Sequence, residues 1–319
     1  MLYRVIDAGE LPALVSAFME TYEVVAPVKR GRSYAFQAIE SFDEIELDYP
    51  TTIVSPKKYF LPPKETLLEF DACGNQVTDF AAEITPRVIF GAHACDINAL
   101  NRLDLVFKDG RYPDPYYVAR RGATLVVGVS CLPTETCFCH LWGSDEARYG
   151  YDLFLQDIGG KYLVSISSVE AANILEAACD PRVATDEDRI EFRHATRRRQ
   201  AAFNPDIPDI QEVAMLTDAF HKDPFWDELG ERCLSCTACS AVCPPASAST
   251  SRTCATLTAR PGGASACRTP ARRPSSRSWR AATTSVPTGE AACATACTTS
   301  STAFWPTTTG CSAWDAGAA

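Results

Sequence analysis

The chain changes its composition abruptly after Pro244, and this break limits how much of it can build a core. Residues 1–244 contain 38 of the 40 acidic residues and every lysine, isoleucine, methionine, tyrosine and histidine. The remaining 75 residues contain one leucine, one valine and 18 alanines, with seven arginines against two acidic residues. So little apolar area does not offset the entropy that is lost when a backbone is ordered. The sequence therefore predicts a folded body over residues 1–244 and a disordered tail over residues 245–319.

Two explanations of this tail are a natural low-complexity segment and translation out of frame, and the genetic code favours the second. If one base is missing near codon 245, each true codon joins the last base of one written codon to the first two bases of the next. Shifted in this way, residues 245–251 permit Thr-Cys-Gln-Cys-Phe-Asp-Val, and residues 312–319 permit Cys-Val-Gly-Cys-Gly-Arg-Cys. We interpret residues 245–319 as a frameshifted segment.

The composition of the whole chain limits which class of protein it can be. A length of 319 residues with 46% hydrophobic content allows one or two domains with a core. No apolar run approaches the ~20 residues that a membrane-spanning helix needs, and the N-terminus does not read as a signal peptide. The net charge of −10 argues against a nucleic-acid partner. We expect a cytoplasmic protein whose fifteen cysteines include metal ligands rather than disulfides.

Hydrophobic spacing predicts an α/β body over residues 1–204, followed by helices. The expected elements are a helix over 11–22, a strand over 22–27 that ends at its proline, strands over 87–91 and 124–129, a hairpin over 152–167 with its turn at 157–160, a helix over 169–178, and helices from about 206 onward.

Four cysteines near the end of the body, Cys233, Cys236, Cys239 and Cys243, stand at the spacing C-x2-C-x2-C-x3-C-P. In bacterial ferredoxins this spacing lets one tight loop carry three thiolates to one four-iron cluster, while the fourth usually serves a second cluster. A zinc knuckle could use the first three cysteines, but zinc sites usually pair two separated ligand couples. These four cysteines, called the cysteine box below, predict a [4Fe-4S] site. The site would lie at the start of a helical ferredoxin-type dicluster domain over residues 205–244. That domain is incomplete as written, because the second box is found only in the recoded tail.

Four further cysteines lie at or after the ends of the predicted strands, at Cys95, Cys131, Cys137 and Cys139. If the fold brings them together, they fit an additional [4Fe-4S] cluster, with His93 and Asp96 as neighbours that tune it or as alternative ligands. The other interpretation is that they are small buried residues without a metal role. The sequence leaves both interpretations open. Cys73 and Cys179 stand apart from both groups, and we expect them to be inert.

Other patterns in the body give weaker indications of function. The basic run over residues 197–199 is typical of a solvated helix face. No G-x-G-x-x-G motif follows a predicted strand, so the sequence does not predict a nucleotide site. We identify no catalytic residues, and outer-sphere electron transfer through clusters needs none.

Several segments between residues 55 and 245 together carry a family resemblance. They are Ser55-Pro56-Lys57-Lys58, Gly91-Ala92-His93-Ala94-Cys95-Asp96, Thr136-Cys137-Phe138-Cys139, Gly150-Tyr151-Asp152-Leu153 and Leu229-Gly230-Glu231-Arg232-Cys233. The chain resembles the 4Fe-4S dicluster family that contains the iron-sulfur beta subunits of cytoplasmic sulfhydrogenases and the A subunits of anaerobic sulfite reductases.

The resemblance implies an electron-transfer subunit without a catalytic site of its own. It would relay electrons between a flavoprotein subunit that binds NAD(P) and FAD and a catalytic subunit that reduces protons, sulfur or sulfite. Two [4Fe-4S] clusters are expected in an in-frame member, and the upstream cysteines would make a third. The competing hypotheses are a zinc-stabilised interaction module and a non-functional frameshifted product.

Overall fold

A computed structural model describes residues 2–71, 77–79, 84–204, 210–236, 238–247, 249–255 and 263–270. The described residues fall into two compact units. One contains those up to Leu216 together with those from 238 to 270, and the other contains Thr217–Cys236. This division differs from the predicted boundaries at residues 204 and 244, and each unit is described by itself below.

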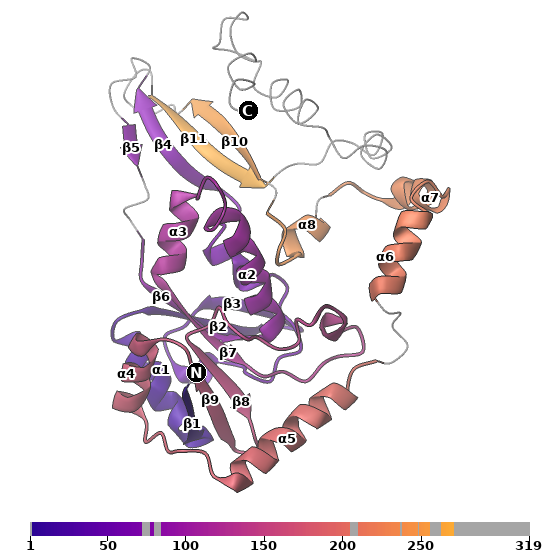
Figure 1. Ribbon diagram of the computed structural model, residues 1–319. Helices are drawn as coiled ribbons and strands as arrows, with labels where there is room; N and C mark the ends of the chain where they lie inside the picture. Colours follow the sequence, from indigo (N-terminus) through magenta and orange to yellow (C-terminus); the bar gives the residue numbers. More distant parts are fainter. Residues whose placement is uncertain are drawn as a thin grey trace, which may run out of the picture. The chain divides into compact units, whose positions relative to one another are not determined.

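The described strands form two sheets in the first unit (Figure 1). The strands are β1 (Leu2–Asp7), β2 (Glu23–Arg30), β3 (Ser33–Ala38), β4 (Glu65–Asp71), β5 (Val77–Asp79), β6 (Arg87–Ala92), β7 (Thr124–Val129), β8 (Leu153–Asp157), β9 (Lys161–Ile166), β10 (Ser249–Ala255) and β11 (Gly263–Pro270).

The larger sheet has seven strands in the order β1-β9-β8-β7-β6-β2-β3. Its centre is parallel, because β2 pairs with β6, β6 with β7 and β7 with β8 in the same direction. Both edges are antiparallel. The carboxyl ends of the central strands therefore lie along one edge of the sheet, the place where open α/β sheets bind ligands.

The described α-helices are α1 (Leu11–Met19), α2 (Ala94–Phe107), α3 (Pro115–Gly122), α4 (Val169–Ala178), α5 (Asp186–Ala201), α6 (Ile210–Ala219), α7 (Phe225–Arg232) and α8 (Ala238–Val242). Helices α1 and α4 cover one face of the large sheet, and α2 and α3 cover the other (Figure 1). Each face has its own hydrophobic core. The fold is thus mixed α/β, as the spacing of hydrophobic residues predicts.

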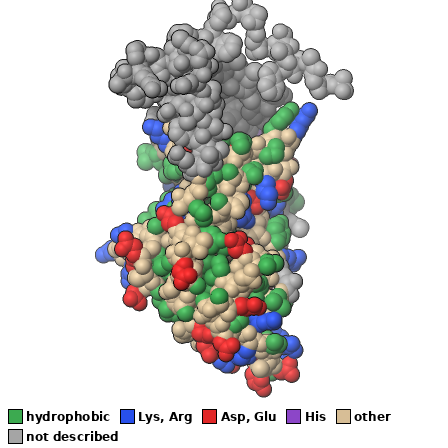
Figure 2. Space-filling model, turned by 90° about the vertical axis from the view of Figure 1, so that its left-hand side faces the viewer, with side chains coloured by type: hydrophobic (Ala, Val, Ile, Leu, Met, Phe, Trp, Pro, Cys, Tyr) green, Lys and Arg blue, Asp and Glu red, His purple; other side chains and the backbone are tan. Residues whose placement is uncertain are grey.

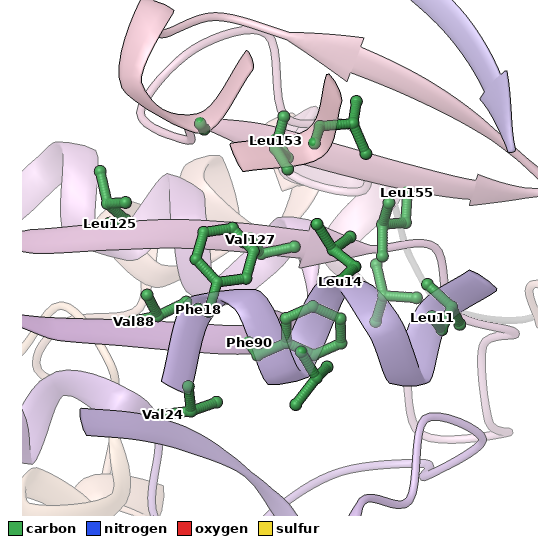
Figure 3. Packing of buried hydrophobic residues seen from close by; sticks show 14 of the residues in the cluster. Leu11, Leu14, Phe18, Val24, Val88, Phe90, Leu125, Val127, Leu153 and Leu155 are labelled. Carbon is green, nitrogen blue, oxygen red and sulfur yellow. The ribbon is translucent and has the colours of Figure 1, made fainter. Parts of the chain in front are cut away.

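Alternating strand residues divide between the two cores. Val88 and Phe90 of β6 face α1, whereas Ile89 between them faces α2. Figure 3 shows Leu14 and Phe18 of α1 directed onto the strands. Phe18 is completely buried, so its replacement by alanine would cost ~3–5 kcal/mol. These cores fix the strands whose ends carry the candidate site.

Most predicted elements are present, with one correction in β2. The strand continues through Pro27 to Arg30 instead of ending at the proline. Its pairing with β6 stops at Val25, whereas Pro27 pairs with Phe36 of β3. Because the pairing with β6 has ended by this point, the missing proline N–H breaks no ladder bond on that side.

The predicted hairpin is confirmed. Strands β8 and β9 are antiparallel, and Gly159 and Gly160 join them with φ values of 88° and 83°. This left-handed backbone region favours glycine, which has no Cβ. The backbone N–H of Gly159 donates to the Asp157 carboxylate at 2.8 Å, which closes the turn.

The prediction of disorder from residue 245 is wrong for two segments. Strands β10 and β11 pair with each other, and β11 pairs with β4, so the second sheet has the order β10-β11-β4-β5. The prediction weighed only buried apolar area. Strand pairing also satisfies backbone hydrogen-bonding groups, whatever side chains the strand carries. The rest of the predicted tail, residues 271–319, lies outside the described residues.

The surface of the described part mixes charged and apolar side chains. Figure 2 shows acidic and basic groups interspersed with hydrophobic ones over one face. Within the described ranges, no helix is both long and apolar enough to cross a membrane.

Candidate metal centre

A cavity of about 420 Å³ lies in the first unit, beside residues that follow β6 and β7. A water molecule needs only about 10–15 Å³ of such space, so the cavity could hold a group much larger than one water. Its walls include all four upstream cysteines, Cys95, Cys131, Cys137 and Cys139. Since β6 and β7 are parallel neighbours, the segments that leave them meet at the same edge of the sheet.

A bulge at the end of β6 aims the chain into this cavity. The register with β7 shifts between Phe90 and Ala92, and Gly91 between them has a φ of 81°. A Cβ at Gly91 would lie 3.0 Å from Leu47 and 3.2 Å from Pro27, so any other residue would be both strained and crowded. Bulges of this kind redirect side chains next to functional sites.

The thiols of the cavity come from separate points of the chain. Cys95 is in the first turn of α2, and Cys131 follows β7. Cys137 and Cys139 belong to the loop beyond, in which the Thr134 backbone N–H donates to the Cys137 Sγ at 3.3 Å. The fold therefore brings together the four cysteines that the strand ends predict as neighbours.

Asn98 of α2 fixes the loop that carries Cys139. Its side-chain amide donates to the carbonyl oxygens of Ser144 at 3.2 Å and Glu146 at 2.9 Å. Ser144 in turn donates from its hydroxyl to the carbonyl of Cys139 at 3.0 Å. Hydrogen bonds of this kind give the thiol a defined position relative to α2.

Loss of solvation favours the neutral form of three of the cavity thiols. It raises the pKa of Cys95 well above its usual range, the pKa of Cys131 to about 12 and the pKa of Cys139 to about 11. A negative charge on any one thiol would raise the pKa of its neighbours further. The site therefore favours thiolates only when a cationic centre compensates their charge, as a bound metal does.

His93 and Asp96 lie where the sequence predicts tuning groups. Both line the cavity, and both are buried. The His93 ring stacks on Tyr49 with centroids 4.0 Å apart, and its Nε2 has no hydrogen-bond partner among the described residues. Burial lowers the pKa of His93 to about 4 and raises the pKa of Asp96 to about 7. The imidazole is therefore neutral at pH 7 and offers one unused nitrogen toward the site.

Arg199 is a cavity residue that the sequence prediction missed. Arg197 and Arg198 are exposed, as expected for a solvated run, but Arg199 is only 5% exposed and lines the cavity. Its guanidinium donates to Glu146 at 2.9 Å, while its buried Nε has no partner among the described residues. The positive charge lowers the pKa of Cys131, which opposes the effect of burial. The only available signal is the position of Arg199 four residues after the buried Ala195 on the same helix face.

The cysteine box is divided between the two units. Cys233 and Cys236 belong to the second unit, whereas Cys239 and Cys243 belong to the first. All four are free and exposed. Ser235 has a φ of 52°, and its backbone N–H donates to the Cys233 Sγ at 3.4 Å. Hydrogen bonds from the backbone to cysteine sulfur are among the factors that set the potentials of iron-sulfur clusters.

The second half of the box includes a short helix that belongs to the first unit. Cys239 lies in α8, and the Cys243 backbone N–H donates to its carbonyl at 3.2 Å. Val242 and Pro244 line the same cavity as the upstream cysteines. Part of the box thus borders the cavity.

The side chains at the cavity suit a cluster better than a single metal ion. Among the described residues, no three His, Cys, Asp or Glu side chains meet closely enough to hold a single ion. In a [4Fe-4S] cluster each thiolate binds a different iron, so the ligands surround the cluster and do not converge on one point. Four thiols lining one cavity fit that requirement.

Of the two cysteines that we expect to be inert, Cys179 lies within the described residues and does not line the cavity. Cys179 follows α4, and its thiol donates to the carbonyl of Glu10 at 3.8 Å. Cys73 lies outside the described residues.

The fold and site define a cysteine-rich α/β protein with one group of thiols in a cavity and another in a ferredoxin-type box. The chain is 33% identical over 245 residues to sulfhydrogenase 2 subunit beta of Pyrococcus furiosus, and the match covers 76% of this chain and 72% of that protein. It therefore belongs to the family of sulfhydrogenase beta subunits. No protein-family profile and no solved structure matches the chain.

Proposed function

We propose that this chain is an iron-sulfur electron-transfer subunit that binds [4Fe-4S] clusters at the cavity and at the cysteine box. The observation that carries the proposal is the convergence of Cys95, Cys131, Cys137 and Cys139 on one cavity from separate points of the sequence. Inert buried cysteines have no reason to gather at one place, whereas cluster ligands must do so. The family membership supports the same conclusion.

The box would hold its cluster through Cys233, Cys236 and Cys239, with Cys243 as the fourth ligand or as a ligand of a second cluster. The spacing of the cysteines supports this assignment. The hydrogen bond from Ser235 to the Cys233 sulfur supports it as well, because it leaves the thiol already held by the loop.

When bound, such clusters supply one-electron transfer without making or breaking bonds to a substrate. The residues of this chain set the surroundings. Burial in the cavity limits the access of water, and Arg199 places a positive charge near the thiolates. His93 can donate a hydrogen bond from its free nitrogen, which would favour the more negative reduced state.

The name of the relative describes it as a subunit of a sulfhydrogenase. We propose the same kind of assembly for this chain. Electrons would pass between a flavoprotein subunit that binds NAD(P) and FAD and a catalytic subunit that reduces protons, sulfur or sulfite, in the cytoplasm. This chain would contain no catalytic site of its own.

Anaerobic reconstitution of the full chain with iron and sulfide tests the proposal. The expected product is brown, contains about four or more irons per chain with equal acid-labile sulfide, and gives an electron paramagnetic resonance signal after reduction with dithionite. A colourless chain that binds zinc without labile sulfide would show a zinc-stabilised module instead. A chain that takes up no metal under either condition would overturn the electron-transfer proposal.

A further inference from the structure

Lys57 is a buried lysine that the cavity and the sequence motifs leave without a role. It belongs to the short 3-10 helix η3 (Pro56–Tyr59), and the Ser55 hydroxyl accepts a hydrogen bond from the Lys57 backbone N–H at 3.4 Å. The Lys57 carbonyl accepts from the backbone N–H groups of Phe60 and Leu61 at 2.9 and 2.8 Å. The main chain of this residue is thus held on both sides, and the residue is only 9% exposed.

The side chain of Lys57 reaches the end of the cysteine box. Its ammonium group donates to the carbonyl of Cys243 at 2.7 Å and to the carbonyl of Ala246 at 3.3 Å. Both residues belong to the same unit as Lys57. These contacts join positions 186 and 189 residues apart in the chain, so they depend on the fold and not on local sequence.

Within the part of the chain that the structure describes, the charge of Lys57 has no local counterion. The ammonium forms no ion pair with any carboxylate among the described residues. A lysine that is largely removed from water and bonded only to neutral carbonyl oxygens keeps a field that solvent screens poorly. That field acts at the main chain of Cys243.

Lys58 provides a natural contrast. It has the same side chain and stands next in sequence, but its ammonium donates to the carbonyl of Phe36 in β3 at 2.6 Å and lies over the Tyr59 ring at 5.1 Å. It therefore points to the body of the sheet, whereas Lys57 points to the box.

We propose that Lys57 is a positioning residue that anchors Cys243 to the body and, by its fixed positive charge, raises the reduction potential of the cluster that Cys243 ligates. This inference rests on the proposed function, since it requires a cluster at the box. One electron entering a cluster adds one negative charge, and a nearby cation stabilises that charge. Cluster potentials respond to net charge, hydrogen bonding and exposure in this way.

The test is a potentiometric titration of the reconstituted full chain with dithionite, followed by electron paramagnetic resonance. Lys57→Gln keeps a hydrogen-bond donor but removes the charge, so one midpoint potential should become more negative. A tenfold change in the one-electron equilibrium constant corresponds to ~59 mV, and we expect a shift of about that size. Lys57→Arg keeps the positive charge, so its midpoint potential should lie close to that of wild type. Lys58→Gln is the matched control and should leave the midpoint potential unchanged.

The outcomes separate the two proposals. A wild-type chain that takes up no cluster overturns the proposed function, and this inference with it. If the variants take up their clusters normally but Lys57→Gln keeps the wild-type potentials, only the role of Lys57 is overturned. If Lys57→Gln fails to fold, Lys57→Arg decides, because a purely steric role of lysine would not be rescued by the larger arginine, whereas a role of charge would.

Discussion

The cavity cysteines and the box cysteines reach a similar donor set by opposite means. In the cavity, Cys95 and Cys131 are held by the ends of neighbouring parallel strands and by a hydrogen-bonded loop, and burial raises their pKa values. In the box, Cys233 and Cys236 stand a few residues apart on one loop. The first site therefore depends on the whole α/β core, and the second on local spacing.

This difference shows which kind of metal site can be predicted from the sequence alone. A local site can be read from spacing alone, because a few residues fix its geometry. A site assembled by tertiary structure requires the sheet to be in place first, so its ligands are preorganised but sensitive to any damage in the core. The predictions below use variants that affect one site and should spare the other.

The largest expected effect is the loss of one whole cluster from the cavity. Cys131→Ser removes one of the four thiols that line the cavity, so the reconstituted chain should contain about four fewer irons than wild type. Iron and labile sulfide per chain measure this. The control is Cys179→Ser, which changes a thiol outside both groups and should keep the wild-type iron content. Equal iron content in the two variants would mean that the cavity binds no cluster.

The next prediction concerns the box and the segment that follows it. Restoring one base near codon 245 should add about four irons per chain, because the recoded tail supplies the cysteines of a second box. Sequencing of the gene provides the direct check. An intact reading frame, or an unchanged iron content after restoration, would refute the recoding.

A good part of the fold could be predicted from the sequence. Buried runs such as 87–91 and 124–129 identify the central strands, because parallel strands are apolar on both faces. The edge strands β1 and β3 were not predicted, since their short and partly exposed segments lack a clear period. The continuation of β2 past Pro27 was missed because it depends on where the pairing with the neighbouring strand β6 stops.

The residues of the candidate site likewise fall into those that the sequence predicts and those that it does not. The box could be predicted from spacing, and the neighbourhood of Cys95 and Cys131 from the positions of strand ends. Arg199 and Lys57 could not, because each acquires its role through long-range contacts that no local pattern encodes. A basic run such as residues 197–199 is typical of a solvated surface, and only the fold shows which of its side chains is turned inward.

The third prediction tests how far the cavity depends on the body. Asp188 is 2% exposed, accepts from Arg182 at 2.8 Å and from the Thr185 backbone at 2.8 Å, and thereby fixes the start of α5, the helix that carries Arg199. Asp188→Ala should lower the free energy of unfolding by about 2 kcal/mol. Thermal unfolding of the metal-free chain measures it, and Asp186→Ala is the control, because Asp186 is exposed in the same helical turn.

The effect of Asp188 should depend on pH with a defined sign. Hydrogen bonds from Arg182 hold the pKa of Asp188 below its ordinary value, so its contribution is complete above an ordinary carboxyl pKa of about 3.9. It is lost as the pH falls through the lower pKa of the folded state. The difference in unfolding temperature between wild type and Asp188→Ala should therefore be constant near neutral pH and shrink in strong acid. A difference that grows in acid would contradict this assignment.

The smallest expected effect lies in the box, where only local geometry is at stake. Ser235 adopts a left-handed backbone conformation that places its N–H against the Cys233 sulfur. Valine in this conformation costs ~1–2 kcal/mol, whereas glycine adopts it freely. Ser235→Val should therefore lose iron to a chelator faster than wild type, and Ser235→Gly should not. Because this loop is remote in sequence from the cavity ligands, the iron that Cys131→Ser removes should be retained in both variants. Faster loss of that iron from Ser235→Val would mean that the two sites are coupled rather than independent.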